Sequence, residues 1–259
     1  MILALINWVG FRFIAICNVF GEFALFLGAA IKTAFNTRLK WHELFVQMSR
    51  IGVHSFTISV ITGAATGAVL AYQSFEGFKK FGGENLLGSI VALSLTRELG
   101  PVLTGLMVTA RAGSSIATEL GTMSISEQID ALRTLCINPY QYLVVPRILG
   151  ATIIMPFLTL FAVMAGIVGG YFVSTIFLGL TPDDFLVGIK EYVDPFDIIG
   201  GLIKSAVFGF ILASISCYQG FSTSGGAREV GLSATQSVVM SSILIIIANY
   251  FLAVILFGI

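Results

Sequence analysis

The chain has 259 residues, of which 56% are hydrophobic and only 11% charged, and its mean hydropathy is +0.95. Soluble globular domains carry about 25% charged residues, so this composition excludes that class and predicts an all-α integral membrane protein. Fourteen basic and fourteen acidic residues cancel, which leaves no net basic charge to favour nucleic acid as a partner. The three cysteines are far apart and lack C-x-x-C spacing, so we expect free thiols, with no disulfide and no metal site.

The N-terminal region is apolar over residues 1–31 but is interrupted by Arg12 and Glu22. We expect it to form a helix that lies in the membrane interface rather than a span. No basic residue precedes the apolar run and no small-residue cleavage site is evident, so no cleaved signal peptide is expected. Residues 1–50 would then form an interfacial helix and a basic cytoplasmic segment, and residues 51–259 a transmembrane domain.

Four uncharged segments are long enough to cross a bilayer, which takes about twenty apolar residues. They cover residues 55–75, 148–182, 205–227 and 230–259. A fifth segment, 86–110, is a span only if it tolerates the dipeptide Arg97-Glu98. The sequence therefore predicts five transmembrane helices.

Basic residues near the span ends are distributed unevenly, and this asymmetry sets the orientation. Nine lie on one side of the five spans, namely Arg12, Lys32, Arg38, Lys40, Arg50, Arg111, Arg133, Arg147 and Arg228, whereas Lys79, Lys80 and Lys190 lie on the other. We therefore expect a cytoplasmic N-terminus and an external C-terminus, with residues 181–197 as an acidic external loop.

Arg97 and Glu98 are the strongest candidates for a functional site. A charge at bilayer depth costs about 2.5 to 3.5 kcal/mol, so each side chain needs a partner, water or a substrate. Neighbouring residues point about 100° apart on a helix, so the two cannot satisfy each other. Pro101 should also free the carbonyl of Arg97 and kink the helix, which favours the wall of a cavity.

Lys204 is a second charge inside a predicted span. It could snorkel to the outer membrane surface, or it could face the same cavity as Glu98, as a pairing partner or a ligand for a lipid headgroup. Tyr72 and Gln73, near the outer end of the first span, could add an aromatic wall and a polar contact, although tyrosine is common at membrane interfaces.

Small residues at a spacing of four, Gly63 with Gly67 and Gly166 with Gly170, mark close helix contacts. We expect these pairs to pack helices within one chain rather than to form a dedicated dimer face.

A short amphipathic helix is predicted between the second and third spans. Ser124 and Glu127 match a capping box, and Asn138-Pro139 supplies a stop, so we expect about a dozen helical residues from Ile125. Its apolar face carries Ile125, Ile129, Leu132 and either Leu135 or Cys136. Amphipathicity alone leaves open whether this face docks on the chain's own helix ends, on lipid, or in a groove of a soluble partner.

Catalytic motifs are missing from the sequence. His42 and His54 are the only histidines, and H-E-x-x-H, G-x-S-x-G and the phosphate-binding G-x-x-x-x-G-K-S/T do not occur. We expect no catalytic residues and no cofactor in this chain, which by itself does not hydrolyse ATP.

The run ALSLTRELGPVLTGLMVTARAGSSIATELGTMSISEQIDALRTLCINPYQYLVVPR resembles the MlaE (YrbE) family of ABC-transporter permeases, which move lipids with MCE-domain proteins. The resemblance covers residues 40–259 and is most specific over 92–147, where RELGP, RAGS, E-L-G-x-M and the EQ-to-NP helix follow in family order. It implies a homodimer of five-span subunits in the bacterial inner membrane, with the C-terminus in the periplasm.

The resemblance further implies a cytoplasmic ABC ATPase (MlaF-like) that binds ATP and Mg, an external MCE-domain protein (MlaD-like) and a small STAS-domain protein (MlaB-like). The family's ATPase-coupling helix matches Ile125 to Cys136, including Glu127 and Gln128, and its lipid cavity matches the region of Arg97, Glu98 and Lys204. Arg97 and Lys204 would then meet the phosphate of a phospholipid. A stand-alone secondary transporter or channel with an intramembrane charge relay is the alternative, although no internal repeat is evident.

Overall fold

The computed structural model describes residues 2–83 and 86–258, and all regular structure in these residues is helical. The predicted all-α class is therefore confirmed for this part of the chain. The elements are α1 (Ile2–Asn36), α2 (Trp41–Phe78), η1 (Lys79–Phe81), α3 (Leu87–Ser94), η3 (Leu95–Leu99), α4 (Gly100–Val108), η4 (Thr109–Gly113), α5 (Ser114–Ile125), α6 (Gln128–Thr134), η5 (Tyr140–Val144), α7 (Val145–Phe172), η6 (Val173–Phe177), α8 (Pro182–Tyr192), α9 (Pro195–Phe221) and α10 (Ala227–Phe257). Of the short segments, η1 is a 3₁₀ turn, and η3, η4, η5 and η6 are π-helical.

Five helical stretches are long and apolar enough to cross a membrane, as the sequence predicts. They are Trp41–Phe78, Leu87–Ile125, Tyr140–Phe177, Pro195–Phe221 and Ala227–Phe257. Each stretch begins earlier or ends later than the segment predicted from the sequence. The first starts at Trp41 rather than near residue 55 because its initial turns bury Leu44 and Ile51 against the bundle.

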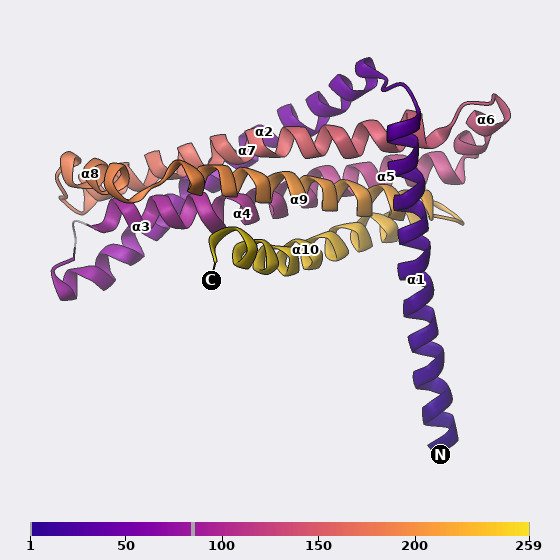
Figure 1. Cartoon of the computed structure of the whole chain (residues 1–259), viewed down its shortest axis with the longest axis horizontal. Helices are drawn as coiled ribbons and strands as arrows, with labels where there is room; N and C mark the ends of the chain where they lie inside the picture. The colour runs from indigo at the N-terminus through magenta and orange to yellow at the C-terminus, as the bar shows by residue number, and fades with distance from the viewer. Residues whose placement is uncertain (1, 84–85, 259) are drawn as a thin grey trace.

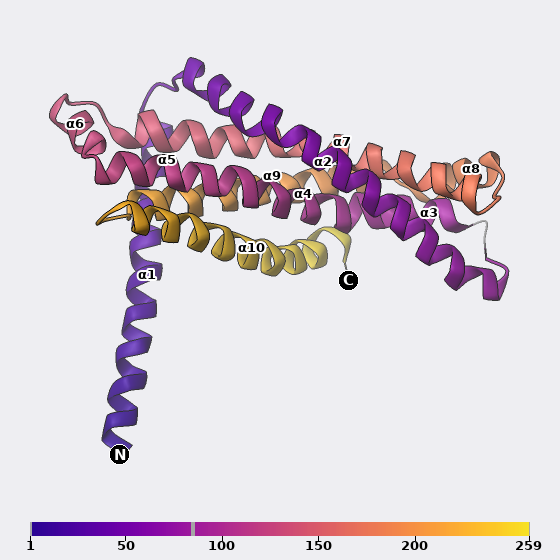
Figure 2. The ribbon, with the colours of Figure 1, turned by 180° about the vertical axis from the view of Figure 1, so that it is seen from behind.

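The five stretches form an elongated bundle with two distinct ends (Figure 1). The short helix α6 lies at one end, and α3 and α8 lie at the other. Helix α1 crosses the bundle near the α6 end, and its N-terminus points away from the other helices (Figure 2). Its last turns are anchored by Phe26 and Ala30, which are buried in the core. This crossing direction agrees with the prediction that α1 is not one of the spans.

Helices α2 and α7 pack closely through glycine. A Cβ atom added at Gly67 would lie 1.9 Å from the carbonyl oxygen of Gly166, and one at Gly63 would lie 2.2 Å from that of Ala162. Only glycine permits so close an approach of two backbones. The prediction that these small residues pack within one chain is confirmed.

The helix predicted from Ile125 is shorter than expected, and its predicted capping box is wrong. Helix α5 continues to Ile125, Glu127 takes a left-handed conformation (φ 58°), and α6 begins only at Gln128. The hydroxyl of Ser124 donates instead to the carbonyl oxygen of Thr223 at 2.9 Å. The Ser124 hydroxyl is therefore engaged in a tertiary contact and does not cap the helix as the local motif predicts.

The segment predicted as an acidic external loop is largely helical. Thr181 caps α8 by accepting a hydrogen bond from the backbone of Asp184, and the last residues of the segment begin α9. Phe185 of α8 is fully buried, and a Cβ atom at Gly88 of α3 would lie 2.1 Å from its carbonyl oxygen. Asp183, Asp184 and Glu191 therefore belong to a helix that is packed on α3, whereas Asp194 and Asp197 lie at the start of α9.

The Gly67→Ala variant should separate α2 from α7, because its methyl group would overlap the backbone of Gly166. We expect a loss of about 1 to 3 kcal/mol of stability, measured as a lower midpoint of thermal unfolding in detergent. Gly77→Ala, in the same helix with open space around its Cβ position, is the matched control. Equal midpoints for the two variants would contradict the close packing.

Candidate substrate site within the helix bundle

The charged dipeptide lies in the π-helical segment η3, which wraps one extra residue into the second span. The backbone N–H of Gly100 donates to the carbonyl of Leu95, five residues earlier. Pro101 has no N–H to offer to the carbonyl of Arg97. That carbonyl instead accepts a hydrogen bond from the Lys204 ammonium at 3.0 Å. The predicted free carbonyl is therefore confirmed, and its partner is a side chain from another helix.

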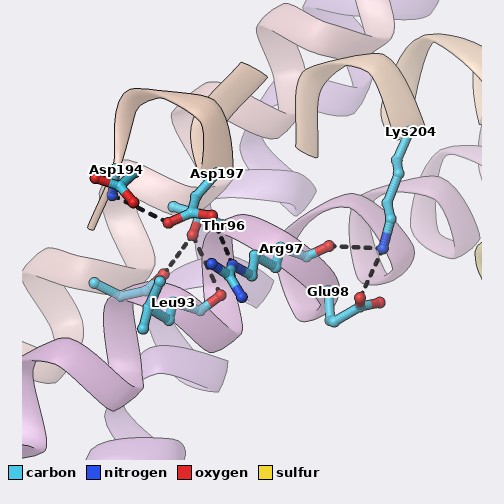
Figure 3. A network of polar contacts seen from close by, with 8 residues as sticks. Leu93, Thr96, Arg97, Glu98, Asp194, Asp197 and Lys204 are labelled. Carbon is cyan, nitrogen blue, oxygen red and sulfur yellow. Dashed lines mark hydrogen bonds and ion pairs between the residues drawn. The ribbon is translucent and has the colours of Figure 1, made fainter. Parts of the chain in front are cut away.

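Lys204 also pairs directly with Glu98, at 2.7 Å from Nζ to Oε1 (Figure 3). The second carboxylate oxygen of Glu98 accepts from the Asn249 side chain of α10 at 2.9 Å. The Lys204 side chain is 0% exposed, so it does not snorkel. A fully buried ammonium requires such partners because its desolvation is otherwise uncompensated.

Arg97 is held by a different carboxylate. Its Nε donates to Oδ1 of Asp197 at 2.7 Å, and Oδ2 of Asp197 accepts from the backbone of Asp194 at 3.1 Å. Asp197 therefore has two roles: it caps the start of α9 and it holds the Arg97 side chain (Figure 3). The ring of Phe257 lies 5.0 Å from both the Arg97 guanidinium carbon and the Lys204 ammonium, which is within cation–π range.

One face of α9 carries the residues that meet the second span. Asp197, Gly201 and Lys204 follow a spacing of four and three residues, so they lie along one side of the helix. A Cβ atom at Gly201 would lie 2.1 Å from the carbonyl oxygen of Thr96. The glycine therefore lets α9 approach η3 closely enough for the two flanking charges to reach their partners.

The network lies level with the middle of an apolar surface band on α7. On α7 and η6, large apolar side chains are exposed from Ile153 to Phe177, a length of about 36 Å at 1.5 Å per residue. Val163 and Gly166, near the centre of this band, are the α7 residues closest to Gly100 and Leu95. The band matches a hydrocarbon core of about 30 Å, so Arg97 and Glu98 lie at bilayer depth.

The bundle brings together three of the five residues predicted for the site. Arg97, Glu98 and Lys204 belong to one network, whereas Tyr72 and Gln73 lie on the exposed side of α2. No hydrogen bond or ion pair recorded for the described residues joins those two to the network. Lys204 faces protein in this conformation rather than a cavity.

The sequence reasoning missed three members of the network, Asp197, Asn249 and Phe257. Asp197 was assigned to the external loop, although its spacing to Lys204 would have placed both on one helix face. Asn249 is one of two amide side chains, with Gln236, in an apolar span, a signal that was available. Phe257 carries no distinguishing signal, because aromatic residues are common throughout the chain.

The residues of the predicted coupling helix divide between two surroundings. Ile129 is buried and Leu132 packs against the same core, so this part of the apolar face docks on the chain's own helices. Leu135 is 69% exposed, and Glu127 and Gln128 are exposed beside it. A surface for another molecule therefore remains at the end of α6.

Five membrane-crossing stretches that enclose a charged network define an all-α integral membrane protein. The model of the family Permease MlaE matches residues 44–255. The chain belongs to this family and is thus the permease subunit of an ABC transporter, with a role in transport rather than catalysis.

Several relatives are similar over most of this chain. A probable ABC transporter permease protein of Rickettsia felis is 44% identical over 99% of both chains. The intermembrane phospholipid transport system permease protein MlaE of Haemophilus influenzae is 30% identical over 100% of this chain and 99% of its own. The chloroplastic protein TRIGALACTOSYLDIACYLGLYCEROL 1 of Arabidopsis thaliana is 35% identical over 87% of this chain and 65% of its own.

The Lys204→Met variant should leave the Glu98 carboxylate and the carbonyl of Arg97 without their ammonium partner. Breaking a buried ion pair in this way costs about 3 to 5 kcal/mol, which we expect to appear as a lower unfolding midpoint in detergent. The double variant Lys204→Met/Glu98→Gln should recover part of the loss, since no unpaired carboxylate remains. Lys190→Met, at an exposed position of α8, is the control, and a Lys204 variant as stable as this control would refute the pairing.

Proposed function

We propose that this chain is the permease subunit of an ABC transporter that moves phospholipids between the bacterial inner membrane and an MCE-protein conduit toward the outer membrane, where it maintains lipid asymmetry. The name of the Haemophilus influenzae relative supports phospholipid as the cargo class. The observation that carries the proposal within this chain is the partly exposed arginine at the centre of the apolar band.

Arg97 is the member of the network best placed to meet a lipid phosphate. Its recorded hydrogen bond to Asp197 uses Nε, and its side chain remains 40% exposed. Guanidinium groups bind phosphate through paired N–H donors, and the terminal nitrogens provide that geometry. Glu98, by contrast, uses both oxygens within the protein, and Lys204 is fully enclosed. The role of Glu98 and Lys204 is to position the second span relative to α9.

The charges of the network balance, which suits a carrier that must also release its cargo. Two cations, Arg97 and Lys204, face two anions, Glu98 and Asp197. A phosphate therefore meets one arginine whose charge is already offset, so binding is weaker than at a free guanidinium. Moderate affinity favours passage of the lipid over its retention.

The proposed assembly is a homodimer with a cytoplasmic ATPase at the α6 end and an MCE-domain protein above the α3 and α8 end. The N-terminus is cytoplasmic and the C-terminus periplasmic, and a STAS-domain protein accompanies the ATPase. Closure of the ATPase on ATP and Mg pushes the two α6 helices together and collapses the central cavity, which expels the lipid. The exposed Leu135 supports docking of the ATPase at this end.

The cargo assignment is tested by reconstituting the full transporter in vesicles and measuring the ATP-driven movement of a fluorescent phospholipid. We expect Arg97→Lys, which keeps a positive charge beside Asp197 but lacks the paired N–H donors of a guanidinium, to lower the transport rate about tenfold, with normal assembly. Arg38→Lys, an equivalent change at an exposed position outside the network, should transport normally. Full transport by the Arg97 variant would rule out its contact with phosphate.

The docking surface is tested by Leu135→Asp, which places a charge on the exposed end of α6. We expect the ATPase subunit to be lost on purification, while the permease itself elutes and unfolds as the unmodified protein does. Leu186→Asp, at an exposed position of α8 at the opposite end, should retain the ATPase. Retention of the subunit by both variants would contradict docking at Leu135.

A further inference from the structure

A second charged cluster lies at the α6 end of the bundle, outside the network around Lys204. Glu119 of α5 pairs through the same oxygen, Oε1, with Arg50 of α2 at 3.2 Å and with Arg147 of α7 at 3.1 Å. One carboxylate thus joins three of the five spans. Because a single negative charge can offset only one of the two arginines, the cluster keeps an excess positive charge.

The excess charge is fixed in place by burial. The Arg147 side chain is only 2% exposed, its NH1 donates to the carbonyl of Leu143 at 2.8 Å, and its Nε has no partner among the described residues. It cannot move to solvent to be neutralised. Arg50, in contrast, is 58% exposed, so the open face of the cluster is an exposed guanidinium backed by a buried one.

Polar groups continue from this cluster toward the centre of the band. Arg111, Ser115 and Glu119 follow a spacing of four residues and so lie near one another along the second span. Arg111 donates to the hydroxyl of Ser55 on α2 at 3.0 Å, and Ser115 is exposed. A second arginine therefore stands deeper on the same α2 interface, between Arg50 and the level of Arg97.

The cluster lies outside the apolar band, on the α6 side of the bundle. Arg147 precedes Ile153, the first exposed residue of the apolar band on α7, by six residues, or about 9 Å. Glu98 and Glu119 are 21 residues apart on the second span, which corresponds to about 32 Å. That separation exceeds half of a hydrocarbon core of about 30 Å, so the cluster is beyond the apolar region on the α6 side.

We propose that Arg50, backed by the buried Arg147 and by Arg111 one step deeper, binds the phosphate of a phospholipid headgroup in the leaflet on the α6 side. This inference deepens the proposed function and rests on it for the identity of the ligand. Arg50 contacts the phosphate, and the buried charge of Arg147 makes the local electrostatic potential more positive. Glu119 holds both arginines and weakens the site by its own charge, so that the headgroup can leave.

The test uses the full chain, purified with its partners in dodecyl maltoside, a detergent without phosphate. The probe is a phosphatidylglycerol with a photoreactive headgroup, and the labelled peptides are identified by mass spectrometry. We expect labelling of the peptides that contain Arg50 and residues 111–119. Arg50→Gln should reduce that labelling about tenfold, as expected for one charge-assisted hydrogen bond, whereas Arg50→Lys, which keeps the charge, should retain most of it.

Two further variants separate a lipid site from a structural ion pair. Glu119→Gln removes the offsetting carboxylate and should increase labelling several-fold, whereas a purely structural cluster would lose order and label no better. Arg228→Gln removes an exposed charge at the same end of the bundle (Figure 1) and should leave labelling unchanged. An equal decrease with Arg228→Gln would show a diffuse surface attraction and would overturn the assignment.

The source of the phosphate is resolved by two additional arms. A photoreactive diacylglycerol without phosphate should not label the cluster, and millimolar inorganic phosphate should not displace the phospholipid probe. Displacement by inorganic phosphate would assign the site to a soluble ion and overturn the headgroup. Transport is measured separately, so labelling at Arg50 without ATP-driven transport would refute the proposed function alone, and transport without this labelling would refute the second site alone.

Discussion

The burial of one ammonium group determines how the second span and α9 fit together. Lys204 has no contact with water, so acceptors within the protein must compensate the loss of its hydration. Pro101 provides one of them by leaving the carbonyl of Arg97 free, and Glu98 provides the other. The extra residue of η3 and the absence of a side chain at Gly201 bring these groups within reach. The proline, the extra residue and the glycine would each weaken an isolated helix. Together they define how the second span packs on α9.

Features governed by local chemistry or by hydropathy were predictable from the sequence. The five spans follow from apolar length, the free carbonyl from Pro101, and the α2–α7 contact from the glycine spacing. The capping box at Ser124 failed because its hydroxyl bonds to a residue about 100 positions away. Asp197 was missed for the same kind of reason, since its partner Arg97 is also remote in sequence. Tertiary contacts of this kind leave no local pattern.

The two charged clusters differ in net charge, and the difference fits their depth in the membrane. At the centre of the apolar band, cations and anions are equal in number, because an unbalanced charge there has no water to stabilise it. At the α6 end, near the level of headgroups, an excess of arginine is tolerated because solvent and phosphates are close. Arginines lie at three levels along the second span, with Arg50 and Arg111 at its interface with α2 and Arg97 at its interface with α9.

The second span connects the docking surface with both clusters. Helix α6 is tied to the core by Ile129, and α5 continues from its start into η4 and η3 as one helical stretch. π-Helical segments hold one extra residue per turn and are frequent at functional sites. Arg97 and Glu98 lie within η3, and Arg111 lies within η4. In the proposed mechanism, a push on α6 is relieved at these irregular turns of the second span, where the residues proposed to meet a phosphate are located.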